Sequence, residues 1–246
     1  MRPHRGRFIF IYGVLAAVFA FGLVGTVLWA GRAINPGPAW SAWKPRGGGL
    51  GAAKQIAEHV GSTYRLQSGL QLVDVIAKAP AVAAGKQQVP VHYLDLRRAK
   101  GAGDTYVQIS SSDSLTYSMC GAGQSCAIAT GKPSVARGTL VRREILELAL
   151  YTFKYVGGIH HVIAFMPPKL GSRPTIAIYL QKADLSEQLK RPLANTLSPK
   201  PPLVSTIGAR AREQHTIDTL LNPRTFNFSL AQSQQGDAIL VLQPPA

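Results

Sequence analysis

The stretch LVRREILELALYTFKYV, residues 140–156, decides the fold expected for this chain. Val141, Ile145, Leu148 and Thr152 recur at the spacing of one helix face. The pattern predicts a core helix of about five turns that lies on a sheet, and the two glycines that follow end it. We expect its charged residues to form a solvated side: Arg142, Arg143, Glu144, Glu147 and Lys154.

Strand signals flank this helix on both sides. Runs rich in β-branched and apolar residues predict strands at 70–77, 89–96, 105–110, 162–166 and 175–181, and a hairpin of 225–231 with 238–243. Shorter helices are expected at 52–60, 185–190 and 207–221. This order predicts an α+β fold, with a mixed or antiparallel sheet packed on the long amphipathic helix.

Residues 8–30 carry no charged side chain. A helix of this length would cross a hydrocarbon core of ~30 Å, so the segment is expected to be a transmembrane anchor at the start of the fold. Arg2, Arg5 and Arg7 precede it, and the positive-inside rule then keeps residues 1–7 in the cytoplasm and places the rest outside. A cleaved signal peptide is the alternative, although its apolar region is usually about 7–15 residues long.

A Pro- and Gly-rich stretch, residues 31–51, follows and is interpreted as a juxtamembrane linker. Residues 52–246 are expected to form the extracytoplasmic domain, with a possible boundary between two lobes at the Pro-rich stretch 191–202. Four aromatic residues are candidate anchors at the membrane interface: Tyr12, Trp29, Trp40 and Trp43.

The two cysteines, Cys120 and Cys126, are separated by five residues that include two glycines. Their flanks favour strands, so we expect a tight β-hairpin whose ends are joined by a disulfide. An exported domain allows such a bond to persist. The alternative, metal or redox chemistry, is disfavoured because the spacing is C-x5-C and a zinc site needs two further ligands.

The chain is strongly basic, with 27 Lys and Arg against 12 Asp and Glu and a formal charge of +15. Such an excess favours anionic partners, which for an exported domain are wall polymers or lipid headgroups rather than nucleic acid. A uniformly solvated basic surface is the alternative, since no Lys/Arg block exceeds two residues. The candidate anion contacts are Arg97, Arg98, Lys100, Arg210 and Arg212.

Two adjacent histidines, His160 and His161, open the predicted strand at 162–166. Neighbouring strand residues point to opposite faces and do not readily chelate one ion. The spacings H-x-x-x-H and H-E-x-x-H do not occur, so we expect no metal site and no cofactor. One histidine is expected to be half-buried against the core helix. A catalytic site built from His161 with Asp95 or Asp113 is the alternative.

Four motifs follow one another between Cys120 and Pro168: CGAGQSC (120–126), GKPS (131–134), RREILELALYTFKYV (142–156) and FMPP (165–168). In this order they resemble uncharacterised single-pass membrane proteins of actinobacteria. The resemblance extends over much of the part after the apolar segment. It implies a location and an architecture, and it supplies no catalytic residue.

These observations predict a membrane-anchored, extracytoplasmic, non-catalytic scaffold or binding protein of the cell envelope. Its expected partners are the lipid bilayer, an anionic wall polymer, or other envelope proteins, including a membrane complex to which it is an accessory subunit. The alternative is an envelope hydrolase or transferase whose site is assembled from distant residues.

Overall fold

The computed structural model describes residues 18–19, 21–22, 39–84, 87–100, 103–121, 123, 126–128 and 133–245. The chain divides into two compact units, Met1–Trp40 and Ser41–Ala246. The second unit contains all the strands described below and both cysteines.

The transmembrane helix predicted for residues 8–30 requires a correction of the fold class. No helix among the described residues is long and apolar enough to cross a membrane. Of the predicted span the structure describes four positions, 18, 19, 21 and 22, whereas a crossing needs about 20 residues. Tyr12 and Trp29 lie outside the described residues. The described architecture is a mixed α+β fold.

Nine described strands form one mixed sheet. Eight follow the order β1-β5-β6-β7-β8-β9-β3-β2, and β4 pairs with β3 beside that path. Their bounds are β1 Asp74–Lys78, β2 Ala81–Ala84, β3 Gln87–Lys100, β4 Gly103–Ser110, β5 Ser114–Cys120, β6 His161–Phe165, β7 Ile176–Gln181, β8 Thr225–Gln232 and β9 Ala238–Gln243. The pairs β5–β6 and β3–β9 are parallel, and the other pairs are antiparallel.

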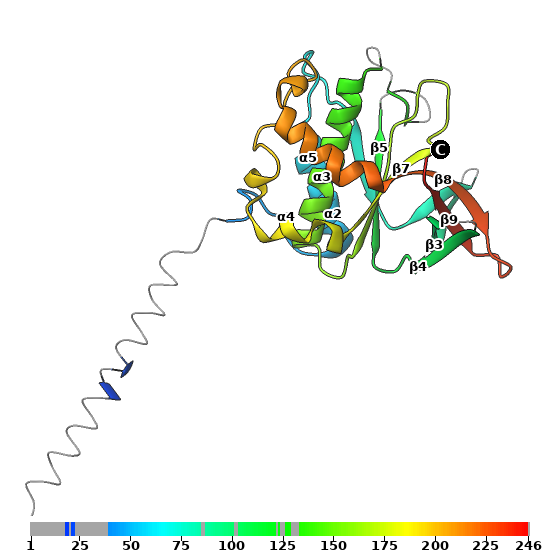
Figure 1. The fold of residues 1–246 in the computed structure, drawn as a ribbon, viewed down its shortest axis with the longest axis horizontal. Coiled ribbons are helices and arrows are strands. Elements are labelled where there is room, and N and C mark those ends of the chain that lie inside the picture. Colours follow the sequence, from blue (N-terminus) through cyan, green and yellow to red (C-terminus); the bar gives the residue numbers. More distant parts are fainter. Residues whose placement is uncertain are drawn as a thin grey trace, which may run out of the picture. The chain divides into compact units, whose positions relative to one another are not determined.

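The α-helices described in the second unit are α2 (Gly49–Gly61), α3 (Val135–Tyr155), α4 (Ser186–Lys190) and α5 (Ala211–Leu221). Figure 1 shows them gathered beside β5 and β7, while β3, β4, β8 and β9 extend away as a wing. The core helix predicted at 140–156 is confirmed as α3, which begins five residues earlier because Ser134 caps it by accepting a hydrogen bond from the Arg137 amide.

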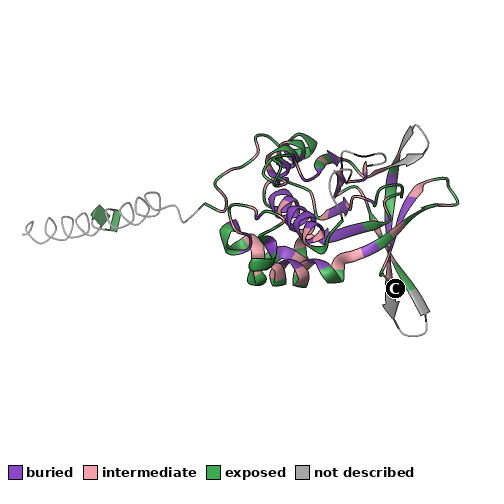
Figure 2. Ribbon diagram, turned by 90° about the horizontal axis from the view of Figure 1, so that it is seen from above, coloured by how far each residue is buried: buried purple, intermediate pink, exposed green. Residues whose placement is uncertain are grey.

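Helix α3 is buried around almost its whole circumference, as Figure 2 shows. Tyr117 of β5 hydrogen-bonds Thr152 of α3 over 2.7 Å between two buried hydroxyls, and this bond fixes the helix against the sheet. The opposite face of the sheet has its own apolar cluster, which includes Leu94, Tyr179, Phe226 and Leu242. The sheet therefore separates two apolar layers, and side chains that alternate along a strand enter different ones.

Candidate functional site

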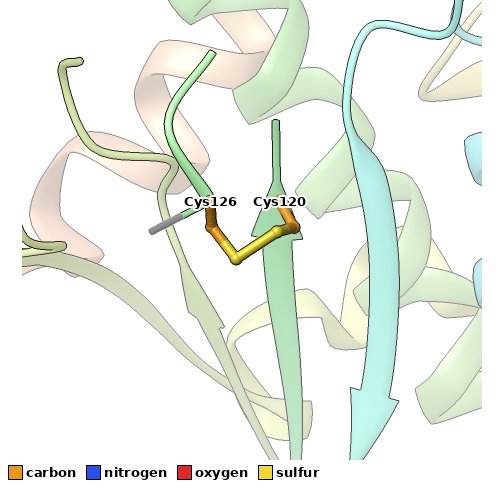
Figure 3. Close-up of a disulfide and its surroundings, with 2 residues drawn as sticks. All are labelled: Cys120 and Cys126. Atoms are coloured by element: carbon orange, nitrogen blue, oxygen red, sulfur yellow. A yellow bond between two sulfur atoms is a disulfide. The ribbon is translucent and has the colours of Figure 1, made fainter. Parts of the chain in front are cut away.

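The predicted disulfide between Cys120 and Cys126 is confirmed, with its two Cα atoms 4.3 Å apart (Figure 3). Cys120 is the last residue of β5. Gly121 lies so close to the returning chain that a Cβ atom there would be 2.3 Å from the Ala127 carbonyl oxygen. A glycine is therefore required beside the first cysteine, and Cys126 has a left-handed backbone with φ 64°.

The hairpin predicted around this disulfide is wrong. Strand β5 pairs with β1 on one side and with β6 on the other, so both of its edges are occupied. Residues 126–128 return beside Gly121 through backbone hydrogen bonds and form no strand. The disulfide closes a loop at the end of a central strand.

The most enclosed polar cluster of the described structure surrounds Arg143, whose side chain has no exposed surface. Its Nε donates to Glu213 Oε1 over 2.9 Å and its Nη1 to Glu147 Oε2 over 3.1 Å. Nη1 also donates to the Tyr64 hydroxyl, and Nη2 donates to the Ser198 carbonyl over 2.7 Å. One guanidinium thus joins α3 to α5, to the turn after α2 and to the segment before α5.

The acceptors of this cluster are bound to one another as well. The Tyr64 hydroxyl donates to Glu147 Oε2 over 2.6 Å. The Ser198 amide and hydroxyl donate to the two oxygens of Glu213 over 2.9 and 2.7 Å. Arg210 Nη1 adds a contact of 3.3 Å to Glu213. Each charge is therefore both paired and hydrogen-bonded, as an enclosed ion group requires.

The two carboxylates of the cluster differ in their electrostatics. Burial raises the pKa of Glu147 above its usual value, and the opposing charge of Arg143 does not fully offset this. Burial acts the same way on Glu213, but there the hydrogen bonds from Ser198 and the charge of Arg143 outweigh it and leave the pKa below its usual value. Burial raises the pKa of Tyr64 far above 10, so its hydroxyl stays protonated and donates to Glu147.

Glu144, the neighbour of Arg143, is also fully buried. Neither oxygen of its carboxyl group has a hydrogen-bond partner among the described residues. Burial, and then the charge of Glu147, raises the pKa of Glu144 well above its usual value. Burial therefore favours the protonated, neutral form of this carboxyl group relative to a solvated one.

The solvated charged side predicted for this helix is wrong for Arg143 and Glu144. The sheet, α2, α5 and the segment around Ser198 surround α3, so its polar side meets protein instead of water. The spacing of Arg143 and Glu147 identified the pair itself. Tyr64, Ser198 and Glu213 were missed, because nothing in the sequence links these distant residues to one arginine.

A second polar cluster lies at the start of β6, on the sheet face opposite α3. His161 stacks on Tyr179 with ring centroids 5.7 Å apart, and the Tyr179 hydroxyl lies 2.8 Å from His161 Nδ1. His161 Nε2 lies 3.5 Å from Asp113 Oδ2. Burial lowers the pKa of His161, and the charge of Asp113 opposes this only in part. The expected half-burial of one histidine is confirmed for His161, and His160 is exposed, but the expected packing on the core helix is wrong because His161 lies on the other face of the sheet.

The structure brings His161 close to Asp113 but not to Asp95, because β7, β8 and β9 separate β6 from β3. Both ring nitrogens of His161 face protein groups, so neither is directed at an open site. Three cavities lined by described residues lie elsewhere, at the first turn of α3, between α2 and β1, and beside His92. Within the described ranges, no group of three or more His, Cys, Asp or Glu residues is placed to hold a metal ion.

The predicted anion contacts occupy different environments. Arg212 is exposed at the start of α5, whereas Arg210 is engaged with Ser198, Glu213 and the Lys200 carbonyl. Arg97 is half-buried on β3, and the side chains of Arg98 and Lys100, on the same strand, lie outside the description. The described members of this set, Arg97, Arg210 and Arg212, do not form one patch.

Of the predicted interface anchors, Trp43 packs inside the second unit. Its ring stacks on His59 at a centroid distance of 3.9 Å and meets the edge of Tyr151. Ser41 bonds the Tyr155 hydroxyl over 2.7 Å, so the compact unit begins before residue 52. Trp40 is half-buried and belongs to the first unit.

The stretch 191–202, predicted as a possible boundary between two lobes, lies inside the second unit, where Leu193 and Leu197 are buried.

No family model, curated protein or solved structure matches this chain. The resemblance to actinobacterial single-pass membrane proteins therefore stays a prediction.

Proposed function

We propose that this chain is a non-catalytic binding or scaffold protein of an extracytoplasmic compartment such as the cell envelope, where it contacts an anionic partner. The observation that carries the proposal is the closure of both polar clusters upon themselves. The ionisable groups that contact Arg143 and His161 directly are bound to one another, so they hold the fold together and present no free base or nucleophile to a substrate.

The disulfide supports the compartment, because such bonds persist in oxidising surroundings and are rare in the cytosol. Quenching cells in acid and then labelling the denatured proteins with a maleimide polymer tests this directly. We expect Cys120 and Cys126 to resist the reagent until a reductant is added. Modification of both thiols before a reductant is added would contradict the proposed compartment.

The charge of the second unit supports an anionic partner. From Ser41 onward the sequence has 23 Lys and Arg against 12 Asp and Glu. Among the described residues, the exposed acids are Glu58, Asp74 and Glu187. The exposed cations are Lys44, Arg46, Lys54, Arg65, Lys154, Lys169, Arg173, Lys190, Arg191, Lys200 and Arg212. This excess favours association with phosphate-bearing wall polymers or anionic headgroups.

Binding of the full chain to polyphosphate and to phosphatidylglycerol vesicles, measured over a series of NaCl concentrations, tests the partner class. Affinity should fall steeply with salt, because exposed charges are screened. Reversing three exposed cations, by Arg191→Glu, Lys200→Glu and Arg212→Glu, should abolish it. The matched control, Arg191→Lys, Lys200→Arg and Arg212→Lys, keeps the charge and should bind as the parent does. Salt-independent binding, or none, would remove the anionic partner from the proposal.

A second candidate function, an envelope hydrolase or transferase, rests on the proximity of His161, Asp113 and Tyr179. In that function His161 would act as a general base held by Asp113. A panel of ester, phosphoester and glycoside substrates, assayed with the parent and with His161→Asn, distinguishes the two functions. Turnover that the variant loses would favour the enzyme.

A further inference from the structure

The first turns of α3 and the loop after β6 enclose a cavity of about 270 Å³. Helix α3 and its cap supply Ser134, Arg137, Gly138 and Val141, which lie three, four and seven residues apart and so share one helix face. The facing wall is the loop Met166, Pro167, Pro168, Lys169 and Leu170, with Ile128, which follows Cys126 by two residues. One wall of the cavity is therefore formed by helix α3.

The chemistry of the wall is both apolar and cationic. Most of its side chains are hydrocarbon, yet it includes Arg137, which is only 7% exposed, and Lys169. None of the residues that line the cavity is acidic. The first turn of the 21-residue helix α3 likewise has no acid, so the positive end of its dipole is not offset locally. The wall therefore suits a ligand with an anionic head and an apolar body.

We propose that this cavity binds a single-chain amphiphile with a carboxylate head, of the size of a medium-chain fatty acid. The head lies toward Arg137, Lys169 and the start of α3, and the chain lies against Val141, Met166 and Leu170. The volume is slightly below the range of about 300–1,000 Å³ typical of small-molecule sites, which limits the length of the chain. The proposal is separate from the polymer contact proposed above, so either can fail while the other stands.

Gly138 offers a way to fill the cavity without harming the fold. A Cβ atom at this position would meet no atom within 4 Å, and the residue is in a helix, where leucine is favoured over glycine. Gly138→Leu in the full chain should keep or raise the melting temperature and should weaken decanoate binding at least about tenfold, since the added side chain occupies the ligand volume.

The matched control is Gly51→Leu, which adds the same side chain to α2 at an exposed helical position where a Cβ also meets open space. This control should bind decanoate as the parent does. Titration calorimetry below the micellar concentration measures all three proteins. Failure of the parent to bind decanoate, or equal binding by Gly138→Leu at an unchanged melting temperature, would overturn the proposal.

The head group is tested with decanol and with Lys169→Gln. Decanol shares the chain but has no charge, so it should bind at least about tenfold more weakly than decanoate if the cationic wall selects the head. Lys169 is exposed, and its loss should weaken decanoate about two- to fivefold and leave decanol unchanged. Equal affinities of the parent for decanol and decanoate would reduce the site to an apolar cavity and contradict the proposed class.

Discussion

The clusters around Arg143 and around His161 are built from similar groups but differ in their access to water. The Arg143 side chain is fully enclosed, and its carboxylate partners are 13% and 10% exposed. His161 is 17% exposed and its partner Asp113 is 34% exposed. In the first cluster one guanidinium on α3 hydrogen-bonds to groups in α3, in α5, in the turn after α2 and in the segment before α5. In the second, a histidine and a tyrosine stack at the start of a strand.

This difference indicates that exclusion of water, more than the number of contacts, determines how much a polar cluster contributes to folding stability. An enclosed charge that loses its partner keeps its desolvation cost, so each member of the Arg143 cluster depends on the others. A half-open group that loses its partner is rehydrated. The first cluster is therefore expected to govern stability, and the second to respond to pH with a small energetic effect.

The largest expected effect comes from breaking the enclosed cluster with Arg143→Met. Glu147 would remain buried without a cation and Glu213 would keep only the contact to Arg210, so we expect a loss of about 3–5 kcal/mol in the free energy of unfolding. Urea unfolding of the full chain at pH 7 measures it. A loss smaller than about 1 kcal/mol would mean that water reaches the cluster, and the contrast with His161 would disappear.

Glu144→Gln sharpens the comparison inside the enclosed region. The pKa of Glu144 is raised, so as pH rises above about 4.5 the unfolded chain releases this proton while the folded chain retains it. The parent therefore loses stability with rising pH. The variant, which has no such proton, should equal the parent near pH 4 and exceed it by about 1–3 kcal/mol at pH 8.

Glu58→Gln provides the control for this pH series, because Glu58 is exposed on α2. Because this side chain is exposed, its replacement should change the free energy of unfolding by less than about 0.5 kcal/mol. An equally small difference for Glu144→Gln at pH 4 and at pH 8 would show that the buried carboxyl group loses its proton as readily as in water, which contradicts its raised pKa.

The behaviour of these residues explains how far the sequence could predict the fold. The apolar spacing of α3 and the β-branched and apolar runs of β6 and β7 are local signals, and both were interpreted correctly. The assignment of Arg143 and Glu144 to a solvated side was wrong, because whether water reaches the second side of a helix depends on distant segments. The hairpin at Cys120 failed for the same reason, since β1 and β6 occupy both edges of β5.

The candidate sites were even less accessible to prediction. The predicted helix began at residue 140, so it included Val141 but not Arg137 or Gly138, and the loop 166–170 that closes the cavity comes from another part of the chain. The proximity of His161 to Asp113 was considered as one alternative among several, and Tyr179 was not. Pairings across a sheet depend on strand order, and strand order is set by contacts far apart in sequence.

His161→Asn tests the half-open cluster, with an effect below about 1 kcal/mol. Burial lowers the pKa of His161 from 6.5, so as pH falls below about 6.5 the unfolded chain takes up the proton first and the parent loses stability. The variant should lose less between pH 7 and pH 5. Asp113→Asn removes the carboxylate that opposes the lowering, so it should steepen the loss, whereas no change in either slope would contradict the proposed environment.

The smallest effect is expected at Arg142, the neighbour of Arg143 on the same helix. Its guanidinium reaches Asp218 over 2.8 Å and Asn222 over 2.5 Å, at side-chain exposures of 20% and 39% for the ion pair. Because water replaces the lost contacts, Arg142→Ala should cost only about 0.2–0.5 kcal/mol. A double-mutant cycle with Asp218→Ala, repeated in high salt, should give a coupling that shrinks with screening. If Arg142→Ala cost as much as Arg143→Met, two neighbouring arginines with different access to water would have the same energetic role. That result would contradict the conclusion that enclosure decides how much a polar group contributes to stability.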